Sequence, residues 1–270
     1  MKDINEIAKK LAEGVGAIFD SEEYKAYLEF ASRFHDYSFN NCLLIHMQMP
    51  KATRVAGYKA WQKLGRQVRK GEKSISILAP MMHKNEVEEM DENGDIRKKE
   101  VTWTTYKAVS VFDVSQTDGE ELPSHTDFCK VLDGKVEGYA ELFGKLEAVA
   151  PVPIGFEDIK DGSNGYYNFV ENRIAIKDGM SEAQTIKTAI HEIAHSMLHG
   201  LDGDLYEADS STKELQAESV AFTVCNYLGL DSSDYSFGYI AGWSKGKDIK
   251  ELSANMEVIR KTAETIINAL

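Results

Sequence analysis

The stretch T-A-I-H-E-I-A-H-S-M-L-H-G, from Thr188 to Gly200, decides how the rest of the chain is interpreted, because it contains an H-E-x-x-H motif. His191 and His195 are four residues apart, so on an α-helix they lie on one face and can bind one cation. Glu192 between them can reach a metal-bound water and act as its general base. The motif therefore predicts a catalytic zinc site on a helix.

The residues around the motif indicate where this helix begins and ends. Ser181 and Gln184 form a capping signal at its start, and Gly200 is typical of a helix end. His199 lies one turn beyond the second motif histidine. A histidine at a helix C-terminus is favoured by the helix dipole, so we expect His199 to be structural rather than a third ligand.

A second helix is expected to supply the third ligand. The stretch from 211 to 225 carries two carboxylates on one face, Glu214 and Glu218. One can complete a two-His, one-Glu zinc site, while the other supports a ligating histidine by a hydrogen bond. If Ser211 and Glu214 instead form a capping box, the metal ligand would be Glu218.

Charge is distributed unequally along the 270 residues and suggests two domains. The net charge is −13, but residues 1–126 contribute −2 and residues 127–270 contribute −11. The polar, turn-rich segment 114–127 is the best candidate for a linker. We therefore expect an N-terminal domain over 1–126 and an acidic, metal-binding domain over 127–270.

The first domain combines predicted helices with an antiparallel hairpin. Three helical patterns precede Pro50, and alternating strands flank a hairpin-turn signal at Asn93-Gly94, so we predict the α+β class. Between them lies a basic segment with two aromatic residues, a composition suited to single-stranded nucleic acid. Its candidate DNA-binding residues are Arg54, Tyr58, Lys59, Trp61, Lys63, Arg66, Arg69, Lys70 and Lys73. The alternative is that the aromatic residues belong to the core and the basic face is only solvated.

Several blocks of this first domain resemble one known family. The runs N-N-C-L-L-I-H-M-Q (40–48), A-G-Y-K-A-W-Q-K-L-G-R-Q-V-R-K-G-E-K-S-I-S-I-L-A-P (56–80) and Y-K-A-V-S-V-F-D-V-S-Q-T (106–117) are similar to the N-terminal domain of ArdC-type antirestriction proteins. That resemblance covers roughly residues 1–120. It implies a single-stranded-DNA-binding module of the kind encoded on conjugative plasmids and other mobile elements.

The second domain resembles the ImmA/IrrE-type metallopeptidases and the C-terminal domain of ArdC-like proteins. The likeness is carried by H-E-I-A-H followed by E-L-Q-A-E-S-V-A (214–221). It implies a zincin-like fold in which Glu214 binds zinc and a strand before the active helix, within 165–177, pairs with an extended protein or peptide substrate. The ImmA/IrrE pattern usually has Asn where Glu218 stands, which leaves the supporting role of Glu218 open.

The remaining features restrict the function classes. No apolar run is long enough to cross a membrane and the N-terminus is too polar for a secretory signal, so we expect a cytoplasmic protein without a membrane partner. Cys42, Cys129 and Cys225 show neither disulfide nor C-x-x-C spacing. The main alternative to a peptidase is a DNA-coating antirestriction protein whose metal site is structural or vestigial. A nuclease is disfavoured because no Asp-rich cluster lies near the motif.

Overall fold

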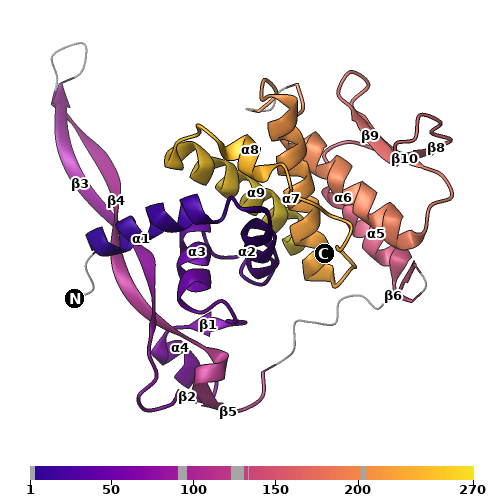
Figure 1. Cartoon of the computed structure of the whole chain (residues 1–270). Coiled ribbons are helices and arrows are strands. Elements are labelled where there is room, and N and C mark those ends of the chain that lie inside the picture. The colour runs from indigo at the N-terminus through magenta and orange to yellow at the C-terminus, as the bar shows by residue number, and fades with distance from the viewer. Residues whose placement is uncertain (1–3, 91–95, 123–130, 133, 202–204) are drawn as a thin grey trace.

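The computed structural model describes residues 4–90, 96–122, 131–132, 134–201 and 205–270. Helices, short strands and one long hairpin make up these ranges, so the predicted α+β class is confirmed (Figure 1). The N-terminal part contains α1 (Ile4–Ala17), α2 (Ser21–Arg33), α3 (Phe39–Gln48), β1 (Val55–Ala56), α4 (Tyr58–Lys63), β2 (Arg66–Val68), β3 (Ile75–Met90), β4 (Ile96–Asp113), the 3-10 turn η1 (Val114–Gln116) and β5 (Thr117–Gly119). The C-terminal part contains β6 (Val131–Leu132), β7 (Lys135–Val136), α5 (Tyr139–Val149), β8 (Ile154–Glu157), β9 (Gly165–Asn168), β10 (Arg173–Lys177), α6 (Glu182–Leu198), α7 (Ser210–Leu228), α8 (Ile240–Ser244) and α9 (Ile249–Ala269).

The N-terminal helices start at polar caps. The Asp20 carboxylate accepts a hydrogen bond from the Glu22 backbone N–H at 3.2 Å, which begins α2. Ser38 caps α3 in the same way by accepting from the Asn41 N–H at 3.4 Å. Pro50 follows two residues after the last residue of α3, as the sequence predicts for a proline that cannot continue a helix.

A long antiparallel hairpin, β3 with β4, is attached to helix α3 at its base. The Asn41 side chain makes both hydrogen bonds to the backbone of Leu78, each 2.8 Å long. Gln48 pairs with the Ser76 backbone in the same way, at 2.9 Å for both bonds. These amides imitate a neighbouring strand and fix the base of the hairpin, while its distal part extends away from the helices (Figure 1). The turn predicted at residues 93–94 lies outside the described residues.

The C-terminal part contains a small sheet ordered β8-β10-β9, with β10 in the centre. β10 is parallel to β8 and antiparallel to β9, and its residues Ile174, Ala175 and Ile176 are fully buried. The two antiparallel strands are joined by a turn with Asn172 at φ 52°, a left-handed conformation that Asn tolerates well. β9 therefore lies at an edge of the sheet, next to α6.

The two halves of the chain share one buried core. Helix α2 packs against α7, and the buried Tyr24 hydroxyl forms a 2.9 Å hydrogen bond with the Ser219 hydroxyl. Helix α9 also reaches the N-terminal helices, because the Glu257 carboxylate accepts from the Phe39 N–H at 2.9 Å. The predicted division near residue 126 stays a prediction about the chain's organisation. Buried apolar residues from before and after this boundary nevertheless pack into one continuous cluster.

None of the helices in the described part of the chain is long and apolar enough to span a membrane. The longest of those helices, α9, is amphipathic. Its buried residues recur every three or four positions, as Leu252, Met256, Ile259, Ala263 and Ile266 do, and charged side chains occupy its other face. Helix α9 therefore packs one face against the protein core.

Candidate metal centre

Helix α6 begins where the sequence predicts and presents the motif on one face. The Ser181 hydroxyl accepts a hydrogen bond from the Gln184 backbone N–H at 3.2 Å. Ile186, Ile190 and Ile193 recur at helical spacing and are fully buried. The adjoining face, which carries the H-E-x-x-H side chains, is thereby turned toward α7 and β9.

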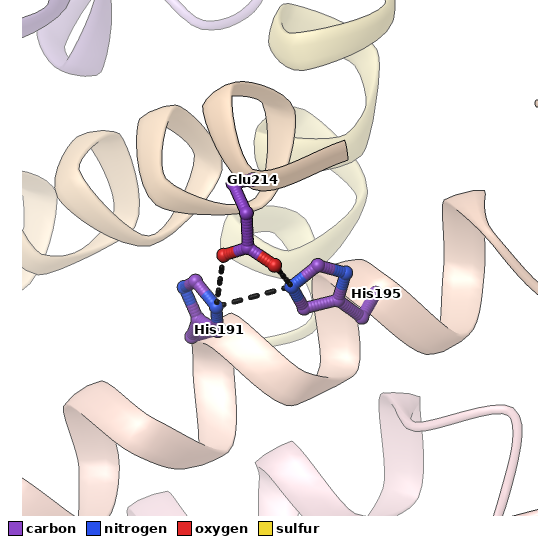
Figure 2. Close-up of side chains that lie close together, drawn as sticks. All are labelled: His191, His195 and Glu214. Atoms are coloured by element: carbon purple, nitrogen blue, oxygen red, sulfur yellow. Dashed lines mark hydrogen bonds and ion pairs between the residues drawn. The ribbon is translucent and has the colours of Figure 1, made fainter. Parts of the chain in front are cut away.

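Two histidines from α6 and one carboxylate from α7 converge on a common point. Figure 2 shows the imidazoles of His191 and His195 facing the carboxylate of Glu214. The two Nε2 atoms lie 3.1 Å apart, and the Glu214 oxygens lie 3.6 Å from the first and 3.4 Å from the second. Tetrahedral zinc ligands at about 2.0–2.2 Å from the metal lie about 3.3–3.6 Å from one another. The two histidine nitrogens and the carboxylate oxygen therefore fit one divalent cation in both spacing and donor type.

The start of helix α7 tests the capping box that would make Glu218 the metal ligand. Asp209 is the N-cap, and its carboxylate accepts from the Thr212 N–H at 3.0 Å. Ser211 lies inside the helix and donates its hydroxyl hydrogen to Asp209. The capping box of Ser211 with Glu214 is therefore wrong, because the cap is made two residues earlier. Glu214 has no capping role and faces the two histidines.

Glu218 lies one turn further along α7 and has a different partner. Its carboxylate accepts a 2.6 Å hydrogen bond from the Tyr239 hydroxyl, and burial raises its pKa. It lines a cavity beside His191 but does not belong to the group of three ligand atoms. Ala217 and Ala221 on the same helix are fully buried. These small residues lie on the packed side of α7, where they allow close approach of neighbouring helices.

The electrostatics of the site follow from burial and from the paired charges. Burial raises the pKa of Glu192, which is only 7 % exposed and accepts a hydrogen bond from the Tyr167 backbone N–H. The imidazoles of His191 and His195, whose Nε2 atoms lie 3.6 Å and 3.4 Å from its oxygens, hold the pKa of Glu214 well below its usual range. Burial lowers the pKa of His191, but the nearby carboxylates of Glu214, Glu192 and Glu218 together outweigh this effect, so the net direction is upward. Glu214 is therefore ionised among the ligand atoms, and the buried Glu192 beside them has a raised pKa.

A cleft runs along both sides of the motif. Two cavities, of about 300 Å³ and about 680 Å³, both border Gly165, His191 and Glu192. A Cβ atom on Gly165 would lie 2.6 Å from the Thr188 side chain and 2.9 Å from the Ala175 carbonyl oxygen. Glycine is therefore required for the close approach of β9 to α6, a requirement that the sequence analysis did not identify.

His199 does not join the ligand atoms, in line with the expectation of a structural role. Its Nδ1 atom lies 2.9 Å from Nδ1 of His195, and its Nε2 atom lies 2.9 Å from Oε1 of Gln216. Burial lowers the pKa of His199 to about 4, so the ring is neutral near pH 7. Sequence reasoning did not identify Gln216, because its relevance depends on how α7 packs against α6.

The basic segment of the N-terminal part contains one aromatic residue that cannot stack on a base in this conformation. Trp61 is fully buried, and its indole N–H donates to the Phe112 carbonyl at 2.8 Å. The prediction that Trp61 serves as a stacking platform is therefore corrected, because its ring belongs to the core under α4. Tyr58 remains 44 % exposed and accepts a hydrogen bond from the Gln67 amide.

The cations of this segment divide into two groups. Arg66 is bonded to Thr117 and to the carbonyls of Gly119 and Glu120, so it joins β2 to β5. Arg69 is paired with Glu72 and Asp118 on the surface. Arg54 is half-buried. The exposed lysines are Lys59, Lys63, Lys70 and Lys73, and they are the predicted cations best placed to meet a phosphate backbone.

Comparison with known proteins finds a family model that matches the N-terminal part. Residues 3–112 match the family model of the N-terminal domain of anti-restriction factor ArdC. An uncharacterized protein of Bacillus anthracis is 27% identical over 304 aligned positions, covering all of this chain and 51% of the relative. The chain therefore spans about half the length of this curated relative.

Solved structures establish that the fold extends beyond the N-terminal part. The metal-free crystal structure of the antirestriction ArdC protein from plasmid R388 matches with a TM-score of 0.51 and 23% identity. The match covers 86% of this chain and 85% of the other. The Mn(II)-bound structure of the same protein matches with a TM-score of 0.52 and 21% identity over 86% and 84% of the two chains. Both parts of the chain thus follow one known architecture.

Proposed function

We propose that this chain, whose residues 3–112 form an ArdC N-terminal domain, binds single-stranded DNA and carries a zinc-dependent peptidase centre in its C-terminal part. One observation carries the enzymatic half of the proposal. His191, His195 and Glu214 converge from two helices, and the buried Glu192 lies beside them at the floor of a cleft. The cellular role that follows is antirestriction, that is, protection of incoming DNA of a mobile element.

The three converging side chains would hold the metal and leave one position for water. Two imidazoles and a carboxylate are a donor set typical of catalytic zinc, and the related R388 protein was crystallised with Mn(II). When bound, the cation would polarise a water molecule and the carbonyl of the bond to be cleaved. Glu192 would accept a proton from that water and deliver it to the leaving amine. Its burial-raised pKa favours this role, because a more basic carboxylate takes up a proton more readily.

The sheet beside the motif supports an extended peptide as substrate. β9 pairs with β10 on one side, and its residues Gly165, Tyr166 and Tyr167 border the larger cavity. A substrate backbone added to this strand would gain main-chain hydrogen bonds without requiring a particular side-chain sequence. It would also place its peptide groups in front of Glu192. This arrangement favours protein or peptide over nucleic acid as the substrate of the metal centre.

The peptidase proposal is tested with Glu192→Gln, which preserves shape but removes the proton acceptor. Zinc-loaded wild-type protein should cleave an unstructured protein such as casein, and a chelator should abolish the cleavage. Glu192→Gln should bind zinc normally and lose about 10²–10⁴-fold in rate. The matched control is Glu141→Gln, the same charge change at an exposed position of α5. Equal rates for Glu192→Gln and wild type would refute the role of Glu192 as general base. If the wild-type protein cleaved nothing, the peptidase proposal would fail and the DNA-coating function would be the remaining one.

The DNA-binding half of the proposal rests on the family match and on the exposed lysines. Lys63→Glu with Lys70→Glu should weaken binding of a single-stranded oligonucleotide and reduce its salt dependence. Each lost phosphate contact lowers the slope of log K against log salt by roughly 0.7. The control reverses two exposed lysines of the other half, Lys160 and Lys250, with the same net charge change. Equal weakening by both pairs would show that only net charge matters and would exclude this segment as the contact surface.

A further inference from the structure

A chain of hydrogen-bonded side chains connects the backbone of α9 to the predicted metal ligand His195. Asn255 Nδ2 donates to the Glu251 carbonyl at 3.0 Å, and its Oδ1 accepts from Gln216 Nε2 at 2.7 Å. Gln216 Oε1 then lies 2.9 Å from His199 Nε2. The chain ends where His199 Nδ1 lies 2.9 Å from His195 Nδ1. Three helices, α9, α7 and α6, thus contribute to one continuous path.

The first link determines the direction of every other link. A backbone carbonyl can only accept, so the Asn255 side chain must turn its NH₂ group toward Glu251 and its oxygen toward Gln216. Gln216 must then offer its own NH₂ group to Asn255, which leaves its oxygen facing His199. His199 Nε2 has to carry a hydrogen to bond that oxygen. In a neutral ring, His199 Nδ1 is then an acceptor, and the hydrogen between the two histidines belongs to His195 Nδ1.

Burial prevents water from replacing these bonds. Gln216 is 1 % exposed and His199 is 5 % exposed, so each of their polar atoms depends on the partner that the fold provides. Turning the Gln216 amide over would place two donors face to face at His199 Nε2 and two acceptors face to face at Asn255 Oδ1. The packing of α7 between α6 and α9 therefore selects one orientation of the whole chain.

We infer that Gln216, His199 and Asn255 are positioning residues that fix the tautomer of His195. With its hydrogen held on Nδ1, His195 presents the lone pair of Nε2 to the point where it meets His191 and Glu214. A divalent cation binds an imidazole nitrogen only through such a lone pair. The inference rests on the proposed metal centre for its purpose, but the tautomers themselves exist without a metal.

The first experiment needs no variant and no metal. Nitrogen-15 NMR of histidine-labelled, metal-free wild-type protein reports which ring nitrogen of each histidine carries the hydrogen. His199 should be protonated on Nε2 alone and His195 on Nδ1. A hydrogen on Nδ1 of His199 would overturn the inference. This outcome is independent of metal binding, so a protein that binds no zinc would refute the proposed function and leave the NMR result to decide the tautomers.

The second experiment measures zinc affinity by competition with a chelator. Gln216→Met removes the acceptor at similar volume and should weaken zinc binding about 10–100-fold and abolish the single tautomer of His199. Gln216→Glu keeps an oxygen facing His199 but sets its other oxygen against Asn255 Oδ1, so it should keep His199 protonated on Nε2 while recovering only part of the affinity. Thr223→Val is the control, because Thr223 is buried on the same helix and bonds the Ser219 carbonyl at 2.8 Å. Wild-type affinity in Gln216→Met, or an equal loss in Thr223→Val, would contradict the positioning role.

Discussion

Replacing Glu214 by glutamine should weaken zinc binding far more than the same replacement at Glu218. The Glu214 oxygens lie 3.4 Å and 3.6 Å from the histidine nitrogens with which they would share the cation. Glu218 instead accepts a hydrogen bond from Tyr239 and belongs to no group of metal-ligand atoms among the described residues. Both changes remove one negative charge and keep the side-chain shape. Any difference between the two variants therefore reports which carboxylate binds the metal.

The expected magnitude follows from the number of protein ligands. Structural zinc sites bind with roughly 10–16 kcal/mol, so one of three protein ligands accounts for about 3–5 kcal/mol. That range corresponds to about 10²–10⁴-fold in the dissociation constant, and the amide oxygen of the introduced glutamine would retain part of it. We therefore expect a loss of about 10²-fold for Glu214→Gln. Glu218→Gln should stay within about tenfold, the lower end of effects from groups that support a ligand.

The measurement is competition with a chelator of known zinc affinity, on proteins first shown to be folded. The Glu214 side chain is 57% exposed, so glutamine in its place should leave the core and the thermal unfolding of the metal-free protein almost unchanged. Wild-type affinity in Glu214→Gln together with a large loss in Glu218→Gln would refute the assignment. That result would assign the third ligand role to Glu218, one turn further along α7.

Three further predictions concern other parts of the molecule. Trp61→Ala should lower the free energy of unfolding by about 3–5 kcal/mol in urea titration, because the indole is fully buried; a change near zero would contradict its place in the core. Cys42 and Cys225, whose pKa values burial raises to about 12, should resist a thiol reagent in folded Cys129→Ser protein and react in denaturant. Zinc affinity should fall as the pH drops through the pKa of His191, because protons compete with the metal. Since that pKa is raised, the decline should begin above pH 6.5, and a flat profile would contradict it.

The sequence was most informative where chemistry depends on local spacing. The motif alone predicts roles for His191, Glu192 and His195, because helix geometry puts two imidazoles four residues apart on one face. The third carboxylate was less certain, because a capping signal read from Ser211 competed with a ligand role for Glu214. In the structure the Asp209 side chain makes the cap, so the capping signal at Ser211 no longer competes with the ligand role that we propose for Glu214.

What sequence reasoning missed depends on contacts between distant segments. Composition cannot distinguish an exposed tryptophan from a buried one, and Trp61 was assigned to the DNA surface for that reason. The sequence makes Arg66 a candidate DNA-binding cation. In the structure β2 pairs with β5, and the Arg66 guanidinium donates a hydrogen bond to Thr117. The path through Gln216 required α9 to lie beside α7, which no local pattern predicts. Local spacing therefore predicts the candidate metal-binding and catalytic groups, while the residues that contact and position them are found only in the tertiary structure.

The shared core connects the N-terminal part directly to the helix that carries Glu214. Helix α2 of the N-terminal part contacts α7 at Ser219, five residues after Glu214 and next to Glu218. Tyr24, the residue of α2 that makes this contact, is fully buried. The N-terminal part and the candidate metal centre are therefore joined through the packing of α2 against α7.

The central claim is that the chain holds one zinc ion with an open coordination position. X-ray absorption spectroscopy of the zinc-loaded protein tests it most directly. We predict one zinc per chain, bound by two imidazole nitrogens, one carboxylate oxygen and one water at about 2.0–2.2 Å. In Glu214→Gln the carboxylate contribution should disappear. A site closed by four protein ligands, or a protein that binds no zinc when both histidines are intact, would contradict the account.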